Sequence, residues 1–88
     1  MNIEWDDAKR AWTLDARSLD FADVAFVDWD TAITLEDVRQ PYPESRYITY
    51  AKINNRLMVF AWCLRGSNLR VISLRKANKR EERKYARD

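Results

Sequence analysis

Between residues 31 and 75 the pattern of apolar and polar residues is typical of β-strands, and in residues 31–36 it alternates with a period of two. Four segments carry this pattern or a continuous apolar run, and they cover residues 31–36, 46–53, 56–64 and 69–75. Because short connections between consecutive strands favour antiparallel pairing, the pattern predicts a four-stranded antiparallel meander. Residues 57–64 are all apolar, so we expect this segment at the centre of the sheet, covered by helices on at least one side.

The connections carry the residues that tight turns require. Asn54-Asn55 separates the second and third segments, and asparagine tolerates the positive φ of a two-residue hairpin turn. Gly66-Ser67-Asn68 separates the third segment from the fourth. Pro41-Tyr42-Pro43 precedes the second segment and is a stiff connection that suits neither a helix interior nor a central strand.

Helices are predicted on both sides of the strand region. Two short ones come first, with Asp6 and Asp20 as candidate N-caps. Their buried faces are expected to hold Ala8, Ala11 and Trp12 in the first helix, and Phe21, Val24 and Ala25 in the second.

A third helix is expected over residues 79–87. Asn78 and Glu81 form the reciprocal capping pattern, and residues 79–87 contain no Gly or Pro. The side chains available for packing are Ala77, Tyr85 and Ala86. This helix is therefore strongly basic and weakly amphipathic, and we expect it to be loosely attached to the sheet.

These elements define an α+β fold within one domain, residues 1–88: a four-stranded antiparallel meander with two N-terminal helices and one C-terminal helix. With 47% hydrophobic and 12% aromatic residues, the chain has the composition of a small folded protein with a thin core. Trp5, Trp12 and Trp62 are assigned to that core.

Charge is divided along the chain. Residues 1–44 hold 4 of the 16 Lys and Arg and 11 of the 14 Asp and Glu, a net charge of −7, whereas residues 45–88 net +9. An arginine-rich half suits an anionic partner, and the phosphate backbone of a nucleic acid is the leading candidate. The acidic half is either an intramolecular counter-charge or a surface for a second, basic partner.

Several kinds of chemistry are excluded by composition. The chain has no histidine, one cysteine and one glycine, so it lacks imidazole catalysis, thiolate zinc sites and Gly-rich phosphate loops. Its acidic residues show no metal-loop spacing, and we expect no metal or cofactor. The lone Cys63 indicates a reducing compartment, and the acidic residues 1–7 do not read as a secretory signal, so we expect a cytoplasmic protein without a membrane span.

The segment 70–75 is the strongest candidate for chemistry. Strict alternation places Arg70 and Arg75 on opposite faces of a strand, and Arg65 approaches one or the other depending on the hairpin register. Clustered arginines suit phosphate because each guanidinium binds two oxygens and never loses its charge. The alternative is a sheet rim whose arginines are only solvated.

A series of residues spans the chain in order: Trp5-Asp6 with Lys9, Phe21, Asp37, Glu44 with Arg46, Arg65, Arg70 with Ile72-Ser73, Arg75 with Ala77, Glu81 and Tyr85. In this series the chain resembles the BrnT family of type II toxin–antitoxin toxins. The resemblance implies a RelE-like fold and a ribonuclease that arrests translation. It also implies neutralisation by a BrnA-like antitoxin with a ribbon-helix-helix part, through which alone the complex would bind operator DNA.

The chain departs from the family pattern near its start. Thr13 and Ala16-Arg17-Ser18 stand where the family shows Asn and then Lys-His-Gly, Ala51 replaces a glycine, and Cys63 replaces a threonine. If the missing histidine assists catalysis in relatives, this chain lacks that assistance. If the arginines carry the rate, little is lost.

The residues are consistent with metal-independent RNA cleavage, in which the 2′-hydroxyl of the substrate attacks the adjacent phosphate. The candidate catalytic residues are Arg65 and Arg75 for charge stabilisation, Arg46 as a helper, Glu44 as general base and Tyr85 as orienting group or proton donor. The candidate RNA-binding residues are Arg70, Lys76, Lys79 and Arg80.

Two alternative functions remain. One is a non-catalytic module whose basic half docks on RNA or on an acidic protein. The other is a membrane-surface role for helix 79–87, which ranks last because that helix lacks a large apolar face.

Overall fold

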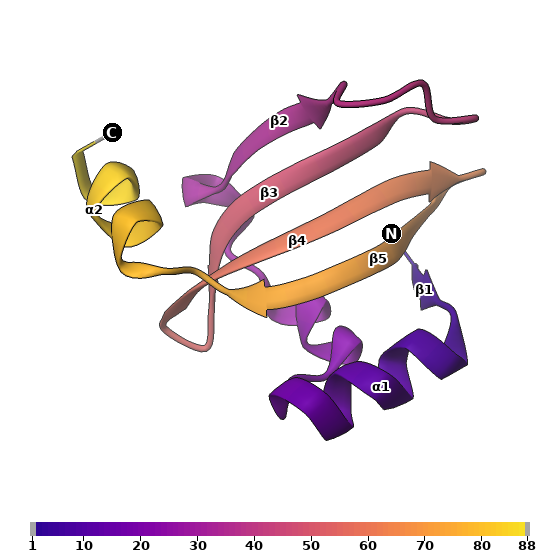
Figure 1. Ribbon diagram of the computed structural model, residues 1–88, viewed down its shortest axis with the longest axis horizontal. Coiled ribbons are helices and arrows are strands. Elements are labelled where there is room, and N and C mark those ends of the chain that lie inside the picture. The colour runs from indigo at the N-terminus through magenta and orange to yellow at the C-terminus, as the bar shows by residue number, and fades with distance from the viewer. Residues whose placement is uncertain (1, 88) are drawn as a thin grey trace.

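The computed structural model describes residues 2–87 and contains one five-stranded sheet, two α-helices and two short 3₁₀ segments (Figure 1). In chain order the elements are β1 (Ile3–Trp5), α1 (Asp7–Arg17), η1 (Phe21–Phe26), η2 (Trp29–Thr31), β2 (Ile33–Asp37), β3 (Arg46–Ile53), β4 (Arg56–Arg65), β5 (Asn68–Lys76) and α2 (Lys79–Arg87). The strand order across the sheet is β1-β5-β4-β3-β2. The α+β class and the central position of the apolar strand β4 are therefore confirmed.

The predicted four-stranded antiparallel sheet is incomplete. Strands β2 to β5 do form an antiparallel meander, but β1 adds a fifth strand that runs parallel to β5 and pairs Ile3 with Leu69 and Trp5 with Val71. Three residues are too few to display a period of two, and the partner of β1 lies more than sixty residues away in the chain. The sheet is mixed because β1 is parallel to β5 while the other pairs are antiparallel.

The turns form where their residues predicted them. Asn54 and Asn55 have φ values of 52° and 66°, the pair of positive angles that joins β3 to β4 in a two-residue hairpin. Gly66, with a φ of 58°, starts the turn from β4 to β5. Both turns hold the register that positions the charged residues of the sheet.

The N-terminal helical elements begin at the predicted caps, and only the first is an α-helix. The Asp6 carboxylate accepts hydrogen bonds from the backbone N–H of Ala8 and Lys9, at 2.9 and 3.1 Å. Asp20 caps η1 through the N–H of Ala22, but six residues wind as a 3₁₀ segment. Residue 31, predicted as strand, belongs to η2, because the Asp28 carboxylate accepts from both Asp30 and Thr31 and holds a turn there.

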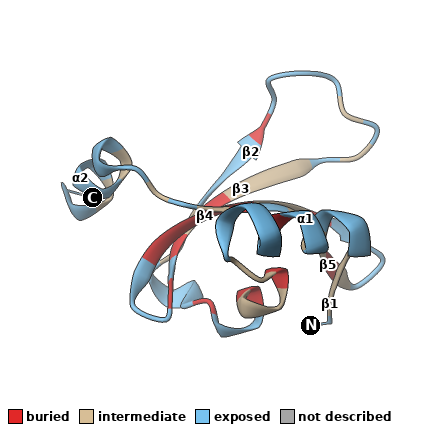
Figure 2. Ribbon diagram, turned by 60° about the horizontal axis from the view of Figure 1, so that its bottom comes forward, coloured by how far each residue is buried: buried red, intermediate tan, exposed pale blue. Residues whose placement is uncertain are grey.

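The core lies between one face of the sheet and η1 (Figure 2). Phe21 and Val24 of η1 are fully buried against strand residues such as Phe60. Four expectations of burial are wrong: Ala8, Ala11 and Ala25 are exposed, and the Trp12 side chain is 57% exposed. Helix α1 buries only Thr13, so the Trp12 ring lies outside the core, with the Arg17 guanidinium 5.0 Å from its centroid. By contrast, Trp5 and Trp62 do pack against the core.

The second face of the sheet carries no helix over its middle, and we call it the open face. Its centre is marked by Tyr50, Val59 and Arg75, which pair across β3, β4 and β5 and so point the same way. The neighbouring residue Phe60 points to the core, where Trp29 of η2 packs on it. Helix α2 stands beyond one end of this face (Figure 1).

Candidate nucleic-acid interface

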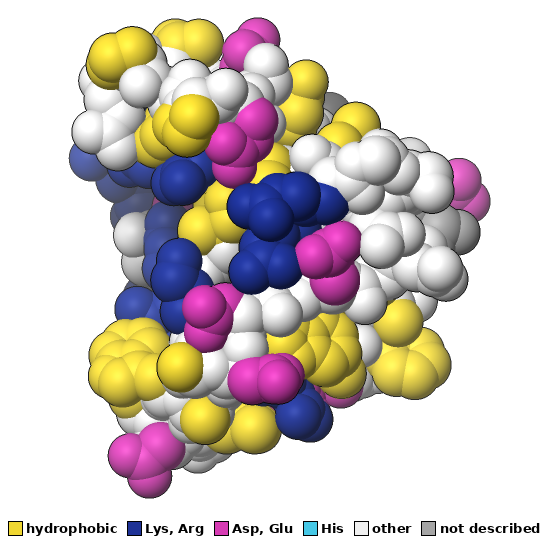
Figure 3. Space-filling model, turned by 90° about the vertical axis from the view of Figure 1, so that its right-hand side faces the viewer, with side chains coloured by type: hydrophobic (Ala, Val, Ile, Leu, Met, Phe, Trp, Pro, Cys, Tyr) yellow, Lys and Arg dark blue, Asp and Glu magenta, His cyan; other side chains and the backbone are white. Residues whose placement is uncertain are grey.

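One row of five residues, four of them charged, crosses the sheet at the end opposite to α2. Each strand contributes one residue to it, and adjacent residues are paired in the register: Glu4, Arg70, Cys63, Arg46 and Asp37. Arg65 lies two residues beyond Cys63 on β4 and therefore shares its face. We call Arg46, Arg65 and Arg70 the arginine cluster. Figure 3, which views this end of the sheet, shows Lys and Arg side chains gathered at its centre and along its left-hand side.

The pKa of the Cys63 thiol depends on the charged groups near the arginine cluster. Burial raises the pKa of this thiol, the nearby Glu44 carboxylate raises it further, and Arg65 and Arg46 act in the opposite direction. Glu44 and two guanidinium groups are therefore near enough to Cys63 to influence the pKa of its thiol.

The three arginines differ in their partners. Arg70 donates to the Glu4 carboxylate at 2.7 Å, and hydrogen bonds from Asn68 and Arg70 lower the pKa of Glu4. Within residues 2–87, neither Arg46 nor Arg65 forms an ion pair. The Nε atom of Arg46 is buried and has no hydrogen-bond partner. The guanidinium groups of Arg46 and Arg65 therefore retain donors for an external anion.

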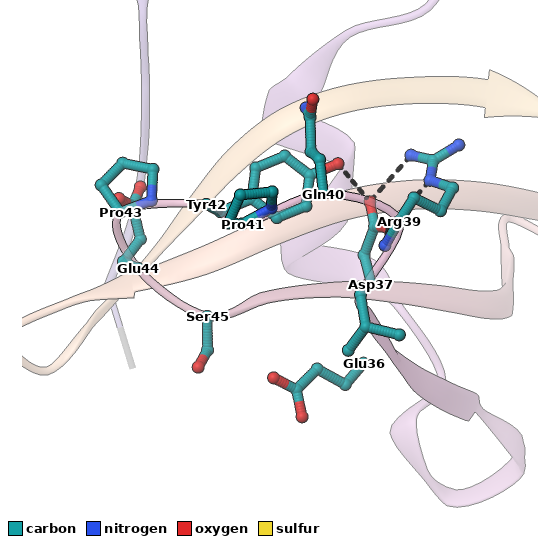
Figure 4. A pocket seen from close by; sticks show the side chains of 10 residues that line it. Glu36, Asp37, Arg39, Gln40, Pro41, Tyr42, Pro43, Glu44 and Ser45 are labelled. Carbon is teal, nitrogen blue, oxygen red and sulfur yellow. Dashed lines mark hydrogen bonds and ion pairs between the residues drawn. The ribbon is translucent and has the colours of Figure 1, made fainter.

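The connection between β2 and β3 orients Arg46. Its guanidinium lies 4.3 Å from the centroid of the Tyr42 ring, and the Tyr42 hydroxyl donates to Asp37 at 2.9 Å. Arg39 binds both oxygens of Asp37 at 2.8 and 2.7 Å (Figure 4). This pairing holds the pKa of the buried Asp37 carboxyl well below its usual range. The same connection lines a pocket of about 610 Å³ beside the cluster.

Arg75 lies at the other end of the open face, so of the two alternatives for Arg65 the hairpin register selects the end that holds Arg70, and Arg65 and Arg75 do not meet. Arg65 pairs with Asn68, whereas Arg75 pairs with Val59, which is about 20 Å away along β4. Arg75 instead donates to both oxygens of Glu81, at 2.8 Å each, and this pair lowers the pKa of Glu81 to about 2. An antiparallel hairpin sends the two arginines to opposite ends because Arg65 is near its turn and Arg75 is far from it.

The prediction that Arg70 and Arg75 face opposite ways is wrong. The register of β4 and β5 shifts between Ala61 and Trp62, which leaves Ile72 as an extra residue on β5. A single extra residue reverses the alternation that follows it. Both arginines therefore lie on the open face.

The candidate residues thus form two groups, one at each end of the sheet. Glu44, Arg46, Arg65 and Arg70 lie at one end; Arg75, Lys76, Lys79, Arg80 and Tyr85 lie at or near the α2 end. The Tyr85 hydroxyl donates to the carbonyl oxygen of Thr31 at 2.7 Å, which ties α2 to the body of the protein. Lys76, Lys79 and Arg80 are exposed.

The family model described as "Ribonuclease toxin, BrnT, of type II toxin-antitoxin system" matches residues 5–81. The chain belongs to the BrnT family. No curated protein and no solved structure gives a significant match. As a BrnT-family ribonuclease toxin it has RNA as its target and a protein antitoxin as its partner.

The match covers the arginine cluster and Arg75 and ends at Glu81, four residues before Tyr85. In residues 2–87 of this BrnT-family chain, no group of three or more Cys, Asp or Glu side chains is placed to hold a metal ion. Neither of the two helices described there is long and apolar enough to cross a membrane.

Sequence reasoning missed the part that Tyr42 and Arg39 play in the candidate site. In the sequence Tyr42 is one of four tyrosines, and neither it nor Arg39 stands in an arginine-rich segment. One signal was present: Asp37 ends a strand shortly before the stiff Pro41-Tyr42-Pro43 connection, where a carboxylate can organise a loop. Its buried position and its three side-chain hydrogen bonds show that role.

Proposed function

We propose that this BrnT-family chain cleaves single-stranded RNA at the arginine cluster without a metal ion, by attack of the substrate's own 2′-hydroxyl on the adjacent phosphate. One observation carries the proposal. Arg46 and Arg65 have no carboxylate partner within residues 2–87 and share one end of the open face, and together with Glu44 they influence the pKa of Cys63. Free guanidinium donors next to a carboxylate are what this reaction requires of a protein.

In this mechanism the substrate supplies the nucleophile and the protein supplies a base and positive charge. Glu44 takes the proton from the 2′-hydroxyl as that oxygen bonds to phosphorus. Arg46 and Arg65 donate to the phosphoryl oxygens, whose negative charge grows in the transition state. The bond from phosphorus to the 5′ oxygen then breaks, the leaving oxygen takes a proton from water, and the products are a 2′,3′-cyclic phosphate and a 5′-hydroxyl.

A further set of residues, drawn from both ends of the sheet, would bind and position the strand. Arg70, Lys76, Lys79 and Arg80 attract its phosphates, and the charge of Arg70 is already shared with Glu4. Arg75 and Tyr85 hold α2 in place through Glu81 and Thr31. Their substitution is therefore expected to lower activity by displacing α2 rather than by removing a group that touches the scissile phosphate.

Cleavage of cellular RNA in this way would arrest translation. We propose that the antitoxin is a BrnA-like ribbon-helix-helix protein that neutralises the toxin by covering the open face. Operator DNA would then be bound only through the antitoxin. A complex in which the open face stays accessible to solvent would contradict this arrangement.

The test compares turnover with binding. Arg65→Ala and Arg46→Ala should each lower kcat by about 100- to 1000-fold, because each removes one transition-state donor. Both should keep most of their affinity for a 2′-O-methyl RNA, which has no free 2′-hydroxyl and should resist cleavage. EDTA should have no effect. The matched control is Arg56→Ala, an exposed arginine at the β3–β4 turn, far from the cluster along β4.

Cleavage of 2′-O-methyl RNA would exclude attack by the 2′-hydroxyl. Normal turnover by both arginine variants would exclude the arginine cluster as the catalytic centre. If the wild-type chain binds RNA without ever cutting it, the protein is a non-catalytic binding module.

A further inference from the structure

A groove separates α2 from the open face of the sheet at the end away from the arginine cluster. Its floor is formed by Ile33, Leu35 and Tyr50, and its wall by Arg80, Lys84 and Tyr85 of α2. It encloses about 500 Å³, which is within the size range of sites for small organic groups. None of the residues of the arginine cluster lines it.

The groove combines an apolar floor with cations on its rim. Leu35 is 58% exposed, and Tyr50 lies directly beside Ile33 in the register. Arg80 and Lys84 are both exposed on the same helix. An apolar and aromatic surface stacks flat rings, and adjacent cations attract phosphates.

The groove and the arginine cluster share one face of the protein. Arg46 and Tyr50 are four residues apart on β3 and point the same way, a separation of about 13 Å along the strand. A stacked RNA strand covers this distance in about four nucleotides at about 3.4 Å each, and an extended strand in fewer. A strand held at the cluster can therefore reach the groove.

We propose that this groove is a nucleobase-binding subsite for a nucleotide about two to six positions from the scissile phosphate. This inference rests on the proposed function, because it takes cleavage to occur at the arginine cluster. The base would stack over Leu35 and Tyr50 while Arg80 and Lys84 contact the flanking phosphates. Short substrates that end before the groove would lose this contribution.

Charge favours RNA over a protein segment as the occupant. Glu81 is the acidic residue of α2 that lines the groove, and its charge is held by Arg75 through two hydrogen bonds. Arg80 and Lys84 on the rim form no ion pair within residues 2–87, and both continue the positive charge of the open face. An apolar segment of the antitoxin is the competing occupant, and the experiment distinguishes it.

The experiment measures kcat/KM for a dinucleotide and a twelve-nucleotide RNA. The twelve-nucleotide RNA should be cleaved at least about tenfold more efficiently, and an abasic residue at the groove position should remove most of that gain. Lys84→Glu and Leu35→Asp should each lower the ratio of kcat/KM for the twelve-nucleotide RNA to kcat/KM for the dinucleotide by about tenfold. Arg83→Glu makes the same kind of charge change on α2 at a residue that does not line the groove, and should leave the ratio unchanged.

Binding of an uncleavable 2′-O-methyl twelve-mer separates this inference from the proposed function. If the wild-type protein cuts no RNA, but Lys84→Glu and the abasic residue weaken binding while Arg83→Glu does not, the subsite stands and the catalytic proposal fails. An active enzyme with equal efficiency on both lengths, or with no response to the abasic residue, overturns the subsite alone. Loss of antitoxin binding by Leu35→Asp with unchanged RNA kinetics would assign the groove to a protein segment instead.

Discussion

Arg46 is held by neighbours that do not neutralise it. The face of the Tyr42 ring attracts the guanidinium, and the Tyr42 hydroxyl is fixed by Asp37, whose negative charge is already matched by Arg39. An aromatic ring orients an arginine without occupying its N–H donors. Arg46 therefore stays available for phosphate, whereas a carboxylate at the same position would compete with the substrate.

We expect Tyr42→Leu to lower kcat for RNA cleavage by about tenfold, because a cation–π contact contributes about 0.5–2 kcal/mol to the placement of Arg46. Tyr42→Phe keeps the ring and loses only the hydrogen bond to Asp37, so it should retain most of the activity. Single-turnover cleavage assays on both variants measure the difference. Equal losses in the two would show that the hydroxyl, and not the ring, positions Arg46.

At the scale of elements, the β3–β4 hairpin depends on two asparagines with positive φ. We expect Asn55→Val to lower the free energy of unfolding by about 1–2 kcal/mol, because a β-branched residue is strained in the left-handed region. Asn55→Gly should be at least as stable as the wild type, since Asn-Gly is the preferred pair in this turn. Urea denaturation followed by circular dichroism measures both, and a stable Asn55→Val variant would refute the turn geometry.

Helix α2 depends on the Arg75–Glu81 ion pair for its attachment. The folded pKa of Glu81 is lowered to about 2 from 4.5, so the pair stabilises the folded state fully above about pH 5 and loses its contribution as the pH falls towards 2. Arg75 is 43% exposed, and solvent limits the contribution to about 1–2 kcal/mol.

We therefore expect Glu81→Gln to be about 1–2 kcal/mol less stable than the wild type at pH 7 and nearly equal to it near pH 2. Urea denaturation at a series of pH values measures the difference. Glu82→Gln on the same helix is the control: Glu82 is exposed, and its substitution should change stability by less than about 0.5 kcal/mol at every pH. A Glu81→Gln deficit that persists at pH 2 would contradict the ion-pair account.

At the scale of the whole molecule, the core is small and centred on β4. Phe60 is completely buried, and its replacement by alanine should cost about 3–5 kcal/mol. Since small domains are stable by only about 5–15 kcal/mol in total, Phe60→Ala should be close to unfolded at 37 °C. Leu64→Ala on the same strand, where the side chain is 47% exposed, should lose less than about 1 kcal/mol. Thermal melts of both variants test this ranking.

The positive charge on the open face acts over the whole molecule. If Arg46, Arg65, Arg80 and Lys84 each neutralise one phosphate, the logarithm of the affinity for uncleavable RNA should fall with the logarithm of salt concentration with a slope of about −3. Lys84→Ala should make that slope less steep by about 0.7. Fluorescence anisotropy titrations at several salt concentrations measure it, and a slope near zero would contradict RNA binding through these cations.

Local signals in the sequence predicted much of the fold. The caps at Asp6 and Asp20, the positive-φ asparagines and the apolar run of β4 each act over a few residues, and each appears in the structure as expected. The failures have non-local causes. Strand β1 forms only because β5 offers it an edge, and Trp12 is exposed because α1 contacts the sheet through other side chains.

The sequence by itself determined the chemistry that the protein can use: no imidazole, a lone thiol, and many guanidinium groups in its second half. Tertiary structure decided which of those groups can act together. The hairpin register placed Arg65 and Arg75 about 20 Å apart, and one extra residue at Ile72 turned Arg70 and Arg75 to the same face. Residue type is a property of each position alone, but pairing register depends on two strands at once, so only the folded sheet could show where the arginines meet.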